Sequence, residues 1–127
     1  VIGIISSVKD FQLAFYLNKQ LKLDLCRKSD HKLDFKAGNC LEFPIFYHED
    51  DCTSITLFGN RPFKKSRGSS SFLINERKEF DFLTKIEGQI NELTVDQVMS
   101  EVRKISKIQF VQLIELGNID SKENLIY

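Results

Sequence analysis

Two carboxylates five residues apart are the side chains most suited to acid–base chemistry in this sequence. Glu76 and Asp81 lie in the stretch Ile-Asn-Glu-Arg-Lys-Glu-Phe-Asp-Phe, residues 74–82. A catalytic pair needs converging side chains and environments that favour opposite protonation states. In the structural alternative, Glu76 pairs with a nearby Lys or Arg, and Asp81 is solvated or caps backbone at a strand edge. Because no catalytic signature accompanies the pair, we expect a protein that is not an enzyme.

Metal ligands and nucleophiles form the second set of reactive side chains, all in one half of the chain: Cys26, His31, Cys40, His48 and Cys52. Structural zinc sites use close pairs such as C-x2-C, whereas thirteen and eleven residues separate these cysteines. A nucleophilic cysteine would need a lowered thiol pKa and a histidine beside it. The spacing favours buried thiols on strands and two surface histidines, so we expect no metal and no cofactor.

A basic, serine-rich loop over residues 61–71 is the candidate contact for nucleic acid. It holds four cations, Arg61, Lys64, Lys65 and Arg67, and Phe72 follows. RNA-binding sheets need alternating aromatic side chains to stack bases, but serines occupy those places here. Eighteen basic residues balance eighteen acidic ones, so the basic excess of a nucleic-acid binder is absent. We therefore hold these four cations, with Glu76 and Asp81, as a candidate interaction site and disfavour nucleic acid as the partner.

Composition points to one globular domain covering residues 1–127. The apolar fraction of 42% is ordinary for a globular chain. Three widely spaced cysteines are typical of reduced thiols, which favours the cytoplasm. No apolar run approaches the roughly 18 residues of a membrane span, and no signal peptide is visible. Val1 stands inside an apolar run, so we expect that native residues could precede it.

The alternation of apolar and polar residues predicts two helices and a set of strands. Helices are expected over residues 9–21, with a Ser7–Asp10 capping box, and over 95–105, with a Thr94–Gln97 box. Residues 29–39 read as a polar turn. Expected strands cover residues 1–5, 23–28, 41–48, 53–58, 72–74, 80–87 and 108–116. Pro44 makes 41–48 an edge or bulged strand, and 108–116, apolar on both faces, reads as central.

This order, β-α-β-β-β-β-β-α-β, predicts the α+β class. We expect a largely antiparallel sheet of six to seven strands with both helices on one face. An elaborated ferredoxin-like β-α-β…β-α-β skeleton fits that order.

The stretch 74–82 resembles the motif of the IPExxxVDY family of small bacterial proteins. Ile74, Glu76 and Asp81 match that motif in identity, whereas Asn75, Phe80 and Phe82 replace its Pro, Val and Tyr. The opening Ile-Gly-Ile, the Asp-x-x-Leu-Ala of residues 10–14 and the closing Ser-Lys-Glu-Asn-Leu of residues 121–125 are similar too. The resemblance implies a fold neighbourhood and no activity, and it leaves Glu76 and Asp81 as the retained polar groups.

The phenylalanine excess carries the functional expectation. Eleven Phe and three Tyr occur without Trp, and six of these rings fall on expected strands: Phe43, Phe46, Tyr47, Phe58, Phe80 and Phe82. Rings that point outward from the uncovered sheet face would bind a partner, whereas inward rings fill the core. We expect a protein-interaction or self-associating domain, with a homodimer as one form. The alternatives are a small-molecule regulatory domain and RNA binding through residues 61–72.

Overall fold

The computed structural model describes residues 1–28, 31–35, 39–50, 53–60, 79–88 and 95–114. Its helices are α1 (Asp10–Leu21) and α2 (Val95–Arg103). Strands β1 (Ile2–Ser6), β2 (Cys26–Arg27), β5 (Ile45–Glu49), β6 (Thr53–Gly59), β7 (Phe82–Gly88) and β8 (Ile108–Leu113) form one sheet. Strands β3 (His31–Phe35) and β4 (Asn39–Phe43) form a separate hairpin.

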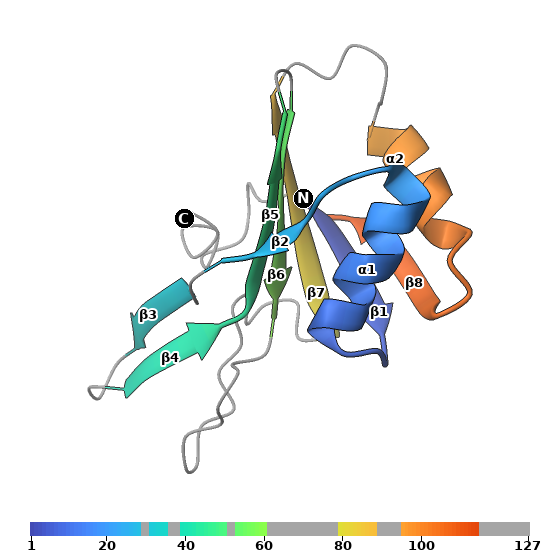
Figure 1. Cartoon of the computed structure of the whole chain (residues 1–127). Helices are drawn as coiled ribbons and strands as arrows, with labels where there is room; N and C mark the ends of the chain where they lie inside the picture. Colours follow the sequence, from blue (N-terminus) through green and yellow to red (C-terminus); the bar gives the residue numbers. More distant parts are fainter. Residues whose placement is uncertain (29–30, 36–38, 51–52, 61–78, 89–94, 115–127) are drawn as a thin grey trace.

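The large sheet has the order β2-β5-β6-β7-β1-β8, and every neighbouring pair in it is antiparallel. Both helices lie on the same side of this sheet, and the β3–β4 hairpin extends away from them (Figure 1). The α+β class expected from the sequence is confirmed, with its antiparallel sheet and its two helices on one face. Elements β1, α1, β6, β7, α2 and β8 follow the β-α-β-β-α-β order of the expected skeleton.

Helix α1 forms because its apolar residues recur at helical spacing and bury one face. Leu13, Ala14 and Leu17 are all buried. The expected Ser7–Asp10 capping box is wrong, because the side chain that closes the first turn is Gln12, whose Oε1 accepts a hydrogen bond from the Lys9 amide at 3.1 Å. The helix ends where Lys22 adopts a left-handed conformation with φ 56°.

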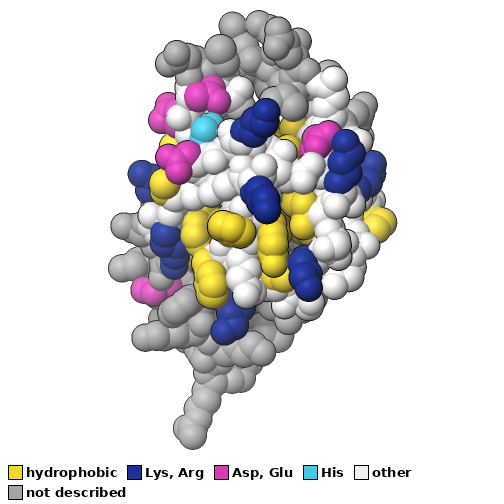
Figure 2. Space-filling model, turned by 45° about the vertical axis from the view of Figure 1, so that its right-hand side comes forward, with side chains coloured by type: hydrophobic (Ala, Val, Ile, Leu, Met, Phe, Trp, Pro, Cys, Tyr) yellow, Lys and Arg dark blue, Asp and Glu magenta, His cyan; other side chains and the backbone are white. Residues whose placement is uncertain are grey.

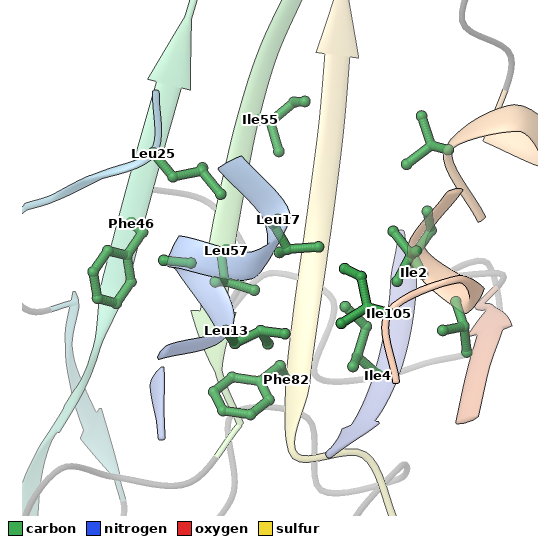
Figure 3. Packing of buried hydrophobic residues seen from close by; sticks show 14 of the residues in the cluster. Ile2, Ile4, Leu13, Leu17, Leu25, Phe46, Ile55, Leu57, Phe82 and Ile105 are labelled. Carbon is green, nitrogen blue, oxygen red and sulfur yellow. The ribbon is translucent and has the colours of Figure 1, made fainter. Parts of the chain in front are cut away.

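The main core lies between the helices and the sheet. Figure 3 shows Leu13 and Leu17 between α1 and the sheet, among side chains of the central strands that include Ile4, Leu57 and Phe82. Val98, Met99 and Val102 close the same cluster from α2. Counted from Val95, these α2 residues lie at i+3, i+4 and i+7, which is the spacing of one face of a helix. Both helices therefore contribute to one continuous core.

A second hydrophobic cluster occupies the opposite face of the sheet. Six buried residues of the described part of the chain belong to it: Phe43, Ile45, Phe58, Phe80, Leu83 and Ile114. Of the six strand aromatics that the sequence offered either to the core or to a partner, five are buried and Tyr47 is half-buried. The five buried rings belong to the two clusters, so the core takes most of these aromatics.

Two expected strands and one expected turn differ from the structure. Pro44 has no amide to donate, so the expected strand 41–48 divides there into β4 and β5, and β5 lies inside the sheet. The polar stretch 29–39 contains β3. Expected strand 23–28 shortens to the two residues of β2.

Strand β8 lies at an edge of the sheet, although its apolar residues suggested a central strand. Val111 faces the helix-side core, whereas Phe110 stacks on Phe80 of the opposite cluster with ring centroids 6.4 Å apart. Apolar residues on both faces therefore reflect two clusters and not a central position. The expected strand at 72–74 and the Thr94 cap lie outside the described residues.

Candidate docking surface on helix α1

The outer face of α1 carries two large exposed aromatic side chains. Phe11 is 57% exposed and Phe15 is 64% exposed, although both belong to a helix with a well-buried inner face. Residues four apart lie on the same side of a helix, so the two rings form one apolar ridge. The Phe15 and Tyr16 rings lie in an edge-to-face arrangement, with ring centroids 5.9 Å apart.

Exposed lysines surround this ridge. Lys19 follows Phe15 by four residues and continues the same helical stripe. Lys9 precedes the helix, and Lys107 lies in the turn between α2 and β8. All three lysines are exposed, and none forms an ion pair within the described part of the chain. Figure 2 shows hydrophobic side chains gathered on this face with lysine and arginine side chains around them.

We call Phe11, Phe15, Lys9, Lys19 and Lys107 the α1 patch. A concave surface borders each of its ends. The first is an open groove of about 720 Å³, lined by residues 6–11 together with Pro44, Gly59, Asp81 and Phe82. The second is a hollow of about 350 Å³, which Tyr16, Lys19 and Lys107 line together with Gln20, Ile105 and Ser106. The patch is therefore a ridge between two depressions.

Acidic groups beside the patch already have hydrogen-bond donors. Asp10 Oδ1 accepts a hydrogen bond from the Phe11 amide at 2.8 Å. Glu101 accepts hydrogen bonds from Lys104 at 2.8 Å and from Gln20 at 2.7 Å, and these donors, Lys104 foremost, lower the pKa of its carboxyl group. These carboxylates are therefore directed toward their own donors, and the lysines give the patch its positive character.

Asp81 stabilises the junction of three strands at the wall of the groove. Its carboxylate Oδ2 accepts a hydrogen bond from the Ser6 amide at 3.0 Å, and its own amide donates to Ile4 O at 2.9 Å. Its carbonyl accepts from the Asn60 amide at 3.0 Å. This geometry is that of a carboxylate that caps backbone at a strand end. Glu76, the other carboxylate of the pair considered for acid–base chemistry, lies outside the described residues.

The two stretches that carry the family resemblance meet in space. Besides the Asp81 contacts with β1, the Phe80 ring lies so close to Gly3 that a Cβ built on Gly3 would stand 2.6 Å from Phe80 Cδ1. Phe80 and Asp81 therefore hold strand β1 against the sheet by packing and by hydrogen bonds. This contact gives both stretches a structural role.

His48 connects three segments and is largely buried, contrary to the expected surface position. Its Nδ1 accepts a hydrogen bond from the Asp24 amide at 3.0 Å, and its Nε2 lies 3.2 Å from Asp50 Oδ2, with 12% of the side chain exposed. An accepting Nδ1 places the ring proton on Nε2, which donates to Asp50. Both ring nitrogens are therefore engaged.

Cys26 is exposed, so the expectation that it is a buried thiol is wrong. The short β2 strand that carries it lies at the edge of the sheet, and its Sγ donates to the Asp24 carbonyl at 3.4 Å. His48 binds the amide of the same Asp24, so the chain brings the two reactive side chains near one residue without pairing them.

Among the described residues no group of three or more His, Cys, Asp and Glu is placed to hold a metal ion. The remaining candidates lie outside what the structure describes: Arg61, Lys64, Lys65, Arg67 and Cys52, and the side chains of His31 and Cys40.

Sequence reasoning missed the α1 patch, although the signal was present. Phe15 follows the buried Leu13 by two residues, which is about 200° around a helix. The two side chains therefore project from opposite sides, and Phe11 and Phe15 had to lie opposite the buried stripe.

The chain was compared with protein-family models, with curated proteins and with solved structures, and no match was found. The resemblance to the IPExxxVDY family therefore stays a prediction. Neither described helix combines the length and the apolar character needed to cross a membrane.

Proposed function

We propose that this chain is a non-enzymatic protein-interaction domain whose partner docks on the α1 patch. The observation that carries the proposal is the exposure of Phe11 and Phe15 on one helical ridge. Covering the exposed half of each ring would contribute about 1 kcal/mol to binding. Contiguous exposed apolar surface rimmed by polar groups is a common mark of an interaction site.

The arrangement of reactive groups supports binding over catalysis. The Asp81 carboxylate accepts a hydrogen bond from a backbone amide, and the His48 ring nitrogens contact a backbone amide and a neighbouring carboxylate. The groove beside Phe11 offers shape and apolar surface, and its carboxylates, Asp10 and Asp81, each hold a backbone amide. The groove residues therefore suit the wall of a docking site better than a catalytic pair of acid and base.

A small-molecule regulatory domain is the second candidate. The groove of about 720 Å³ lies within the range of roughly 300–1,000 Å³ that ligand sites usually have. A metabolite that fits there would raise the melting temperature of the chain in a thermal-shift screen. RNA binding through residues 61–72 stays a prediction, and a salt-sensitive shift of labelled RNA in a gel would support it.

A site-specific photo-crosslinker tests the proposed function. The crosslinking amino acid replaces Phe15 in the cells that make the protein, and the matched control carries it at Gln109, an exposed position on β8. We expect a discrete adduct with a different protein at position 15, lost when Phe11→Ser is added. An adduct of the chain with itself alone, or the same adducts from both positions, would contradict the proposal.

A further inference from the structure

We propose that the segment that docks on the α1 patch is an acidic amphipathic helix of another protein. This inference rests on the proposed function and names the chemistry of the partner. It follows from the unpaired charges around the ridge, the two depressions that border it and the length of α1.

Charge separates an acidic partner from a second copy of this chain. A symmetric contact would bring the α1 patch of one copy against the same patch of the other. The Lys9 end of α1 would then face the Lys19 and Lys107 end of the second helix. Like charges placed opposite one another disfavour binding, whereas carboxylates opposite these lysines favour it. The lysines form no ion pair within the described part of the chain, so a partner's carboxylates would meet unpaired cations.

Shape favours a helix over a flat surface. The twelve residues of α1 span about 18 Å, which corresponds to about three turns of a helix lying alongside. The Phe11–Phe15 ridge fits between the side-chain rows of such a helix. Apolar side chains of the partner would enter the groove next to Phe11 and the hollow next to Tyr16, which a membrane surface would leave unfilled.

Labelled peptides of about fourteen residues test the inference by fluorescence anisotropy with the full chain. Four peptides share one length: an amphipathic helix with Glu on its polar face, the same helix with Gln, the same helix with Lys, and a scrambled acidic peptide without the apolar stripe. We expect the acidic amphipathic peptide to bind about tenfold more tightly than each of the others and to weaken as salt is raised. Vesicles with and without phosphatidylserine are measured in parallel.

Charge reversal on the protein supplies the second arm. Lys19→Glu should weaken the acidic peptide about fivefold or more and strengthen the lysine peptide. Lys28→Glu makes the same change in net charge at an exposed residue that borders neither depression, and it should leave both affinities nearly unchanged. Both side chains are exposed, and circular dichroism melts confirm that each variant folds.

The outcomes separate the partner's chemistry from the docking function itself. Equal affinity for the glutamate and glutamine peptides, abolished by Phe15→Ser, would overturn the acidic partner and leave the docking face intact. Binding to phosphatidylserine vesicles without peptide binding would overturn the proposed function as well. An oligomer in sedimentation experiments that Phe15→Ser dissociates would assign the patch to a second copy and overturn the inference.

Discussion

Gly3 shows how one missing side chain sets the packing of a sheet face. A Cβ at this position would stand 2.6 Å from Phe80 Cδ1, 2.7 Å from Phe80 Cε1 and 2.7 Å from Ile114 Cδ1. Both neighbours are buried in the second cluster, so neither can move aside freely. The absent methyl group is what allows the Phe80 ring to lie directly on β1.

Gly3→Ala should therefore destabilise the protein by about 1–3 kcal/mol, because the added carbon overpacks a filled cluster. Chemical denaturation of the two proteins measures the difference. Phe80→Leu in the same chain removes part of the ring, so the double variant should lose less stability than the two single losses together. Strictly additive losses would show that the contact is not the cause.

Thr84 presents the opposite case, a polar atom placed in the apolar core. Its Oγ1 is buried and has no hydrogen-bond partner among the described residues, and its strand neighbours are Ile2 and Leu57. Thr84→Val keeps the shape and removes the unsatisfied hydroxyl, so unfolding should cost about 1 kcal/mol more.

The matched control is Ser6→Ala. The Ser6 hydroxyl donates to the Lys107 carbonyl at 2.8 Å, so removing it should lower stability by about 1 kcal/mol. Equal losses from both variants in denaturation experiments would mean that the Thr84 hydroxyl does have a partner.

At the scale of elements, a surface carboxylate links α1 to α2 by a hydrogen bond. Glu101 of α2 accepts a hydrogen bond from Gln20 of α1 and another from Lys104. The Lys104 bond, followed by the Gln20 bond, holds the pKa of Glu101 below its ordinary value in the folded protein. A lowered folded pKa means that the ionised carboxylate stabilises the fold above the ordinary carboxyl pKa, and that this contribution disappears as pH falls through the lowered value.

As pH is lowered from about 6 to about 3, we therefore expect the free energy of unfolding to fall less in the Glu101→Gln variant than in the parent protein. Denaturation midpoints across that range measure the difference, which solvent screening keeps small for so exposed a group. Identical pH profiles for the two proteins would remove Glu101 from the helix contact.

The elements also show where sequence reasoning succeeds. Both helices and strands β1, β6 and β7 were predicted because their apolar period states which face is buried. The environment of a strand with apolar residues on both faces was harder to predict. Phe110 and Val111 make β8 apolar on both faces through contacts with different clusters, which no local pattern distinguishes from a central position. The hairpin of β3 was missed because His31, Lys32 and Asp34 give it a polar composition.

The candidate site was predicted less well than the fold for a physical reason. Motif reasoning selected Glu76, Asp81 and the cations of 61–67, of which Asp81 alone lies among the described residues. Asp81 borders the groove and caps the Ser6 amide, which is the structural alternative that the sequence offered for it. Phe11 and Phe15 belong to the candidate site because both rings are exposed among the described residues. The exposure of a side chain depends on the packing of the whole chain, which no local motif records.

At the scale of the molecule, the strand order predicts a gradient of local stability. Strand β1 lies between β7 and β8 and contributes Ile2 and Ile4 to the main core, whereas β2 is a two-residue edge strand with exposed side chains. Hydrogen exchange should show β1 amides opening only with global unfolding and β2 amides opening locally at much lower free energy. Uniform protection across the sheet would contradict this order.

The position of β1 has a consequence for how the chain is made. Residues 2–6 leave the ribosome before the other described elements, yet both strands that pair with them belong to residues 82–113. Until those later residues emerge, the first strand has no neighbours, and the inner face of α1 has little sheet to cover. Closing so long a loop slows folding, so the nascent protein should gain its structure late and nearly all at once.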